Sequence, residues 1–575
     1  MGLPIFRREL TSTPLCDSLH PVLDRVYRGR RVDSLDELDT AVKSLCHYQQ
    51  LKGIGQAAAI LCDAIARQQR VVIVGDFDAD GATSTAVCML GLRQMGLQQV
   101  SYLVPNRFDF GYGLSPEIVD VACDDGAEVI VTVDNGIACL EGVARAKARG
   151  ATVVVTDHHL PGGTLPEADA IVNPNQPDCP FSSKNLAGVG VAFYLMLAIR
   201  AQLQKNQWFK EQQLMAPNLA DLLDIVAVGT VADVVVLDKN NRILVHQGLQ
   251  RIRAGRCRPG ITALLDVAGR APSGIGASDL GFVVGPRLNA AGRLEDMALG
   301  IECLLCDDPM QARYMATELD RLNQQRRTIE TEMKQEAEAA IAALSVNEDS
   351  LPAGLVLYQK DFHQGVIGIV AGRIKDKYKR PTIAFAHQDD ETIKGSARSV
   401  PGVHIRDVLE EVNLRKPGLI PKFGGHAMAA GLSLPMDALA LFSTLFDEVV
   451  AVHLAKAGDL DRIITDGELQ VDEVSLSVAR VLKQAVPFGQ GFEAPLFDGV
   501  FEVVNQRLLK EKHLKLALRL DSGEEVDGIA FNVDPARWPN NRCRYVQLVY
   551  QLEVNVFRGR ETVQLLIQEL IPYAN

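Results

Sequence analysis

Residues 71–85 have the sequence VVIVGDFDADGATST, and the closely spaced aspartates in this stretch constrain the chain more than any other feature. The apolar residues 71–74 predict a buried strand of a parallel sheet. Asp76, Asp78 and Asp80 follow at every second position. Their carboxylates repel one another unless a cation neutralises them, and hard oxygen ligands favour Mg²⁺ or Mn²⁺. The stretch therefore predicts a strand that ends at a metal-binding loop.

Two other interpretations of this loop compete with the metal site. Asp76, Asp78, Asp80 and Gly81 match positions one, three, five and six of an EF-hand, but Val87 stands at position twelve, where an EF-hand has glutamate. A strand also precedes the loop where an EF-hand has a helix, so we disfavour that interpretation. Taken alone, the loop is equally compatible with an acidic surface turn.

The composition is that of a soluble chain with several domains. A length of 575 residues, with 47% hydrophobic and 23% charged residues, predicts three or four domains. No apolar segment follows the opening MGLPIFRREL and no run of about eighteen apolar residues occurs, so we expect a cytoplasmic protein with no membrane partner. Eleven scattered cysteines predict reduced thiols. The net charge of −13 argues only weakly against a nucleic-acid partner, because enzymes carry positive charge locally.

The order of apolar and polar segments predicts a doubly wound α/β domain over residues 61–305. Residues 1–60 are expected to form a helical cap, with an amphipathic helix over residues 31–45, RVDSLDELDTAVKSL. From residue 61, apolar strands alternate with helical stretches, and the strands are VVIVGD, VSYLVPN, EVIVTVD, ATVVVTDHH and ADAIVNP. In such a fold, ligands bind beyond the carboxyl ends of the strands.

Further metal-ligand residues stand at the ends of these predicted strands. Asp134 ends VIVTV, while Asp157, His158 and His159 end ATVVVT. A lone aspartate at a strand end is often only a helix N-cap, but acids or histidines at three successive strand ends are much harder to explain that way. Asp233 lies in the apolar run TVADVVVLD, where a buried carboxylate needs a partner such as a metal.

These segments carry a family resemblance. GDFDADG, TVDNG, TDHH and GTVADVV resemble the four motifs of the DHH phosphoesterase superfamily. Within it, NLAGVGVAFYL and GPRLNAAGRL are similar to the RecJ family of single-strand-specific DNA exonucleases, and the resemblance spans nearly the whole chain. It implies that two Mn²⁺ or Mg²⁺ ions are held by Asp78, Asp80, Asp134, His158 and Asp233. Many DHH relatives carry a histidine near the start of this motif, where this chain has Asp76, and we include Asp76 among the metal ligands.

The chemistry of two ions fits that implied ligand set. Two adjacent ions lower the pKa of a shared water and hold the attacking and leaving oxygens of a phosphoryl displacement. We choose Asp134 as the bridging carboxylate, from its place between the other strand ends. The resemblance also implies that His159 contacts the scissile phosphate. The alternative for His159 is a hydrogen-bonding role behind the ligands.

A second domain is expected after a long helix. Residues 306–345 have apolar residues at helical spacing, and SVNEDSLPAG predicts a domain boundary after them. Residues 353–465 resemble the DHHA1 domain. Glycines there flank polar residues at three predicted loops, which are either phosphate-binding loops or ordinary tight turns. The phosphate-binding candidates in this domain are Arg373, Ser396, Arg398, Gly424, Gly425 and His426.

Residues 466–575 consist of short alternating strands, which predict a β-barrel, and the resemblance identifies it as an OB-fold. The segment 505–519 holds five Lys or Arg residues against one acid, so we choose Lys510, Lys512 and Lys515 as DNA contacts. Base stacking is the alternative role here, but aromatic residues in a small barrel belong more often to its core. The aromatic candidates are Phe531, Tyr545 and Phe557.

The leading hypothesis is a two-metal exonuclease on single-stranded DNA, and the resemblance implies 5′ to 3′ polarity. Arg107 in VPNRF, together with Ser396 and Arg398, is expected to bind a terminal 5′-phosphate. The resemblance further implies a helicase and a single-strand-binding protein as partners, and we expect a monomer. The alternatives are a DHH phosphodiesterase on short oligonucleotides or cyclic dinucleotides, which has no need of the C-terminal barrel, and a non-catalytic DNA-binding scaffold, which has no need of the ligands.

Overall fold

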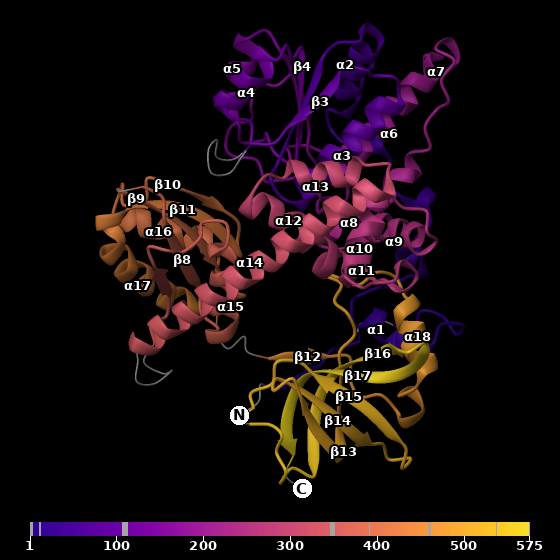
Figure 1. Ribbon diagram of the computed structural model, residues 1–575, viewed down its shortest axis with the longest axis vertical. Helices are drawn as coiled ribbons and strands as arrows, with labels where there is room; N and C mark the ends of the chain where they lie inside the picture. Colours follow the sequence, from indigo (N-terminus) through magenta and orange to yellow (C-terminus); the bar gives the residue numbers. More distant parts are fainter. Residues whose placement is uncertain are drawn as a thin grey trace. The chain divides into compact units, whose positions relative to one another are not determined.

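The computed structural model describes residues 4–10, 13–105, 113–344, 351–389, 391–457, 462–535 and 537–573 (Figure 1). It divides into two compact units. The first unit comprises the chain up to Gly292, Met297–Thr317 and the chain from Arg462, and the second comprises Arg293–Asp296 and Glu318–Asp461. The N-terminal and C-terminal parts of the chain therefore belong to the same unit.

The predicted doubly wound sheet is present in the first unit. All of its strand pairs are parallel, and its strand order is β3-β2-β4-β5-β6. Every residue of β2 and β4 is buried, as expected for strands covered on both faces. The strands are β2 (Val71–Gly75), β3 (Val100–Leu103), β4 (Val129–Val133), β5 (Thr152–Thr156) and β6 (Ala170–Val172).

Helices cover both faces of this sheet. On one face, α4 (Pro116–Asp124) and α5 (Leu140–Ala148) pack on the strands through a cluster of buried apolar side chains. On the other face lie α3 (Ala79–Gln94) and α6 (Gly188–Lys205). The chain leaves β2 toward β3 on one side and returns to β4 on the other, so the strand order reverses between β2 and β4. Ligands of open α/β sheets bind at such a point.

The remaining helices of the first unit surround α3 and α6 or flank the barrel. They are α1 (Pro21–Arg28), α2 (Ile54–Arg67), α7 (Trp208–Glu211), α8 (Leu223–Ala232), α9 (Lys239–Arg253), α10 (Pro259–Val267), α11 (Ala277–Asp279), α12 (Gly285–Leu294), α13 (Ala298–Leu305) and α18 (Leu476–Gln484). All eleven cysteines are free thiols.

The N-terminal segment differs from the predicted helical cap. The helix expected over residues 31–45 is wrong: short 3₁₀ turns form there at Leu35–Leu38 and Val42–Ser44. The side chain of Asp39 accepts hydrogen bonds from the Ala41 backbone N–H (2.9 Å) and the Ser44 hydroxyl (2.5 Å). This local bonding offers the backbone an alternative to a continuous helix.

The start of the chain joins the C-terminal region. Strand β1 (Ile5–Arg7) pairs in parallel with β12 (Ile463–Thr465). The five long strands that follow form a closed barrel in the order β13-β14-β15-β17-β16, which confirms the predicted barrel. They are β13 (Phe497–Leu509), β14 (His513–Arg519), β15 (Glu525–Ala530), β16 (Tyr545–Phe557) and β17 (Arg560–Tyr573).

The second unit begins within the long helix α14 (Pro309–Leu344), which continues from one unit into the other. Its sheet has the order β10-β11-β9-β8-β7, with β7 and β8 parallel and the other pairs antiparallel. Its elements are β7 (Leu355–Tyr358), α15 (Ile367–Tyr378), β8 (Thr382–His387), β9 (Thr392–Arg398), α16 (Ile405–Arg415), β10 (Lys422–Gly425), β11 (Ala429–Pro435) and α17 (Leu439–Ala457).

One helical segment, Met436–Ala457, is long and apolar enough to cross a membrane by length and composition. It contains α17, whose Phe442, Phe446, Val449 and Val450 side chains are fully buried in the core of the second unit. The apolar character of this face of the helix is therefore explained by packing on the sheet.

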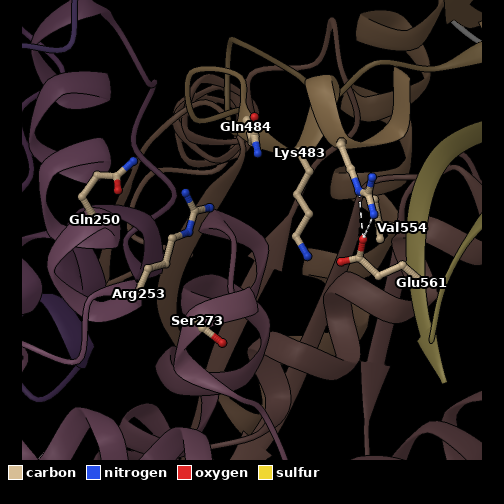
Figure 2. Close-up of a pocket in the computed structure, with 8 residues that line it drawn as sticks. Gln250, Arg253, Ser273, Lys483, Gln484, Val554 and Glu561 are labelled. Atoms are coloured by element: carbon tan, nitrogen blue, oxygen red, sulfur yellow. Dashed lines mark hydrogen bonds and ion pairs between the residues drawn. The ribbon is translucent and has the colours of Figure 1, made fainter. Parts of the chain in front are cut away.

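An open pocket of about 500 Å³ lies between the C-terminal part of α9 and the region of α18 and the β16–β17 hairpin (Figure 2). Arg253, Arg480 and Lys483 contribute positive charge to its wall, and Glu561 contributes negative charge. The Arg480 guanidinium donates a hydrogen bond of 2.8 Å to Glu561. The wall of the pocket is therefore polar and carries both positive and negative charge.

Candidate metal centre and DNA-binding residues

The aspartate loop begins where β2 ends, at the strand-order reversal. Asp78 is the N-cap of α3, and its Oδ1 accepts the backbone N–H groups of Asp80 and Gly81 at 3.0 Å each. The Asp76 Oδ1 accepts the N–H of Phe77 at 2.7 Å. A strand precedes this loop and a helix begins at Ala79, so the EF-hand interpretation is excluded.

The second strand end, at Asp134, has a strained backbone. Asp134 adopts a left-handed conformation with φ of 60°, which is uncommon for a residue other than glycine and concentrates at functional sites. The neighbouring Asn135 side chain holds this turn, because its Nδ2 donates to the carbonyls of Val74 and Val133 at 3.0 and 2.9 Å. Asn135 therefore ties the ends of β2 and β4 together.

The third strand end presents the two histidines. Asp157 is buried, and its Oδ1 accepts the backbone N–H groups of His158 and His159 at 2.7 and 3.1 Å. The same oxygen lies 2.7 Å from Nδ1 of His159. Burial opposes the charged form of His159, but the bond to Asp157 outweighs it and raises the histidine pKa to about 9. Asp157 thus orients the ring of His159 and stabilises its cationic form.

The structure brings all seven candidate residues into three groups of potential ligand atoms. Within each group the atoms lie within 4.8 Å of one another, and the groups are Asp134 with His158 and His159, Asp80 with His158 and Asp233, and Asp76 with Asp78 and Asp134. His158 is shared: its Nε2 lies 3.1 Å from Asp134 Oδ1, 3.4 Å from Asp233 Oδ2 and 3.8 Å from Asp80 Oδ2. This spacing suits ligands around closely placed cations.

The electrostatics of the cluster also fit cations. Burial, and then the charge of Asp78, raise the pKa of Asp80 to about 7. Burial and the neighbouring aspartates raise the pKa values of Asp134 and Asp233 well above the ordinary range. Carboxylates that repel one another in this way are stabilised in their charged form by a divalent ion. The donor set of oxygens with an imidazole nitrogen suits Mn²⁺ or Mg²⁺.

Two of the contacts that position this cluster were not predicted from the sequence. The N-terminus of α6 faces Asp80, whose Oδ2 and Oδ1 accept the N–H groups of Gly188 and Val189 at 2.6 and 2.8 Å. A Cβ atom at Gly188 would lie 2.7 Å from Asp134 Cβ, so this close approach requires glycine. The motif NLAGVGVAFYL was the signal for these contacts, but a glycine-rich helix start does not reveal which carboxylate it faces.

Most phosphate-binding candidates of the second unit lie on strands or a helix and not on loops as predicted. Ser396 and Arg398 lie on β9, where the Arg398 Nη1 donates to Ser396 Oγ at 3.0 Å and to the Ala397 carbonyl at 2.8 Å. Arg373 lies within α15, and its Nε donates to Glu330 Oε1 at 2.8 Å. Helical periodicity overrides the glycines around Arg373, and the partner on α14 could not be inferred from local sequence.

The predicted glycine loop at residues 424–426 is the tight connection between the paired strands β10 and β11. Gly424 and Gly425 lie at the end of β10, and His426 follows in the turn to β11, where its backbone N–H donates to the Ala429 carbonyl at 2.8 Å. Arg107 lies outside the described residues.

The barrel candidates differ in their charge environment. Lys510 and Lys512 are exposed in and beside the β13–β14 turn, whereas Lys515 Nζ lies 2.9 Å from the Asp527 carboxylate. Phe531 and Phe557 are 57% and 67% exposed and so do not belong to the barrel core.

Three families match successive parts of the chain. Residues 70–230 match the DHH family, N-terminal domain; residues 352–452 match the DHHA1 domain; and residues 465–569 match the RecJ OB domain. Over 568 residues the chain is 55% identical to the single-stranded-DNA-specific exonuclease RecJ of Dickeya dadantii (strain 3937), with 98% of each chain covered. The chain belongs to the RecJ family.

Other relatives agree with this assignment. RecJ of Escherichia coli (strain K12) is 53% identical over 568 residues, with 98% of each chain covered. The crystal structure of RecJ from Thermus thermophilus in complex with Mn²⁺ is similar with a TM-score of 0.80 and 28% identity, covering 99% of this chain and 80% of that chain. Its complex with Mg²⁺ gives a TM-score of 0.74 with 27% identity, covering 99% and 79%.

Proposed function

We propose that this chain is a metal-dependent exonuclease that degrades single-stranded DNA from its 5′ end. The observation that carries the proposal is the convergence of five aspartates and two histidines where the strand order reverses. Membership in the RecJ family supports the substrate, because its relatives are named single-stranded-DNA-specific exonucleases. The cofactor is a pair of Mn²⁺ or Mg²⁺ ions, which the RecJ complexes with Mn²⁺ and with Mg²⁺ support.

Each residue of the centre has a proposed task. Bound ions supply an activated water and stabilise the charge that develops on the phosphate. Asp76, Asp78, Asp80, His158 and Asp233 would hold the ions, and Asp134 would bridge them, because Asp134 is the carboxylate that belongs to two of the ligand groups. His159 donates a hydrogen bond to the scissile phosphate while Asp157 fixes its ring.

The defining experiment uses end-labelled DNA. Single strands should be degraded in Mn²⁺ or Mg²⁺ and remain intact in EDTA. A blunt duplex should resist, and strands with a blocked 5′ end should survive even with a free 3′ end. Rapid digestion of blunt duplex, or of 5′-blocked strands, would contradict the proposed selectivity or polarity.

The proposed 5′-phosphate pocket gives a first prediction. Arg398 has a half-buried guanidinium tied to Ser396, and a planar guanidinium binds phosphate with two parallel hydrogen bonds. Arg398→Ala should weaken binding of a 5′-phosphorylated end by about 2 kcal/mol, or about 30-fold. Competition between 5′-phosphorylated and 5′-hydroxyl oligonucleotides measures this. Arg415→Ala, which removes a surface arginine paired with Glu411, should leave the preference unchanged. An unchanged preference in Arg398→Ala means that the pocket is elsewhere.

A second prediction concerns the barrel. Lys510 and Lys512 are exposed, so their contacts with phosphates release counterions. Replacing both with alanine should reduce the slope of log affinity against log salt concentration by roughly 1.4, about 0.7 for each lost contact with a single strand. Lys515→Ala is the comparison: because Asp527 already balances part of the Lys515 charge, it should reduce the slope by less than the loss of either exposed lysine does. Fluorescence anisotropy on a long oligonucleotide measures the slopes, and an equal slope in wild type and the double variant would remove these lysines from the DNA path.

The location, oligomeric state and partners of this protein are also proposals. We propose a cytoplasmic monomer that acts at the nucleoid, supplied with single strands by a helicase and in contact with a single-strand-binding protein.

A further inference from the structure

Helix α12 contacts the aspartate loop although 210 residues separate the two in sequence. The Oδ1 atom of Asn289 accepts the backbone N–H of Ala79 at 2.9 Å. The first N–H groups of a helix have no partner within the helix. In α3, Asp78 accepts those of Asp80 and Gly81, and Asn289 accepts that of Ala79. The Asn289 side chain on α12 thus completes the N-terminal cap of α3, at a residue that lies between the proposed metal ligands Asp78 and Asp80.

A second contact comes from the same face of α12. Gly292 follows Asn289 by three residues, a spacing that places both on one side of a helix. A Cβ atom at position 292 would lie 1.9 Å from the Phe77 carbonyl oxygen, so the two backbones touch and only glycine fits. The face formed by Asn289 and Gly292 therefore meets residues 77 and 79, which alternate with Asp76, Asp78 and Asp80.

We propose that Asn289 is a positioning residue that holds the aspartate loop in its metal-binding conformation. Without ions, the carboxylates favour loop conformations that move them apart. The hydrogen bond from Ala79 to Asn289 and the contact at Gly292 oppose that movement, so the loop meets the ions already folded. Groups that support metal ligands in this way typically contribute 10- to 100-fold to metal affinity. The proposal rests on the proposed metal-dependent function and deepens it.

Metal binding tests the proposal separately from activity. In the full-length protein stripped of metal, Asn289→Ala should weaken Mn²⁺ binding about 10-fold or more, measured by electron paramagnetic resonance or calorimetry. Asn289→Asp keeps an acceptor oxygen for Ala79 and should lose less Mn²⁺ affinity than Asn289→Ala. At saturating Mn²⁺, the alanine variant should recover most of its cleavage rate, because the ligands themselves are intact.

The matched control removes a comparable amide from the opposite edge of the same sheet. Gln68 donates to the Ile65 and Gly96 carbonyls at 2.8 and 2.9 Å and accepts the N–H of Gln98 at 3.0 Å. Gln68→Ala should lower the thermal unfolding midpoint and leave Mn²⁺ affinity unchanged. If Asn289→Ala does not fold, Asn289→Ser, whose hydroxyl is too short to reach Ala79, supplies the same comparison.

Two outcomes overturn the proposal. One is wild-type Mn²⁺ affinity in Asn289→Ala or Asn289→Ser, which lack the hydrogen bond from Ala79. The other is a loss of Mn²⁺ affinity in Gln68→Ala as large as that in Asn289→Ala. Failure of the proposed function is distinguishable, since wild type would then bind Mn²⁺ without degrading single-stranded DNA.

Discussion

Asp134→Asn should abolish DNA cleavage and, when metal is absent, make the folded protein more stable at pH 8. Asp134 is 2% exposed and belongs to two of the three ligand groups, so its loss removes the proposed bridge between the ions. Without ions, burial and the neighbouring aspartates oppose its charge. Asparagine removes that cost, and we expect a gain on the order of 3 kcal/mol, the scale of the desolvation cost of a buried ion.

The pH dependence of stability has a definite sign. The pKa of Asp80 is raised to about 7 in the folded state, and those of Asp134 and Asp233 are also raised. A folded state that binds protons more tightly than the unfolded state loses stability as they dissociate. The metal-free protein should therefore lose stability as pH rises from about 4, the ordinary pKa of an aspartate, to about 7.

Thermal unfolding in EDTA, followed from about pH 4 to pH 8, measures both the pH dependence of stability and the stability gain of Asp134→Asn. Wild type should gain stability with added Mn²⁺ in proportion to the logarithm of its concentration, and Asp134→Asn should gain much less. Asp24→Asn is the control, because Asp24 is a buried carboxylate paired with Arg28 and its neutralisation should destabilise the protein. Retained turnover in Asp134→Asn, or lower stability than wild type in EDTA at pH 8, would refute the bridging role.

The metal cluster was predictable because its position follows from one rule of sheet geometry. Short apolar runs such as residues 71–74 and 129–131, in a chain where strands alternate with helices, predict parallel strands buried on both faces, and the carboxyl ends of such strands meet at one edge of the sheet. Asp76 and Asp134 are the first residues after β2 and β4, so their proximity needs no knowledge of side-chain packing. The closed barrel was predictable for a similar reason, since period-two alternation fixes which side chains face inward.

The supporting contacts were not predictable, because each depends on a partner far away in sequence. Asn289 reaches Ala79 across 210 residues, and Gly188 reaches Asp80 across 108. The periodicity of a helix gives the spacing of its faces but not which loop each face meets. The wrong prediction of a helix over residues 31–45 has a local cause instead. The Asp39 side chain accepts hydrogen bonds from the Ala41 backbone N–H and the Ser44 hydroxyl, and this local bonding competes with a continuous helix.

A buried ion pair joins the N-terminal and C-terminal parts of the chain, in addition to the pairing of β1 with β12. Arg30 and Asp466 have side chains only 1% and 2% exposed, and Arg30 Nη1 lies 2.8 Å from the Asp466 Oδ1. The same guanidinium donates to the Val26 and Glu493 carbonyls at 2.5 and 2.7 Å and lies over the Phe488 ring. Without Arg30, the cation left beside Asp466 among the described residues would be Arg8, whose Nε lies 3.7 Å from the Asp466 Oδ1.

Arg30→Met should therefore lower the free energy of unfolding of the first unit by about 3–5 kcal/mol, the cost of leaving one partner of a buried pair. Arg67→Ala, which breaks the exposed pair with Asp63, should cost less than about 1 kcal/mol. Denaturant unfolding measures both. Because Arg30 fixes helix α1 to the segment that leads into the barrel, binding of long single strands should fall while Mn²⁺ affinity stays at the wild-type value. An Arg30→Met protein as stable as Arg67→Ala would show that contacts other than this ion pair, such as the β1–β12 pairing, hold the two ends of the chain together.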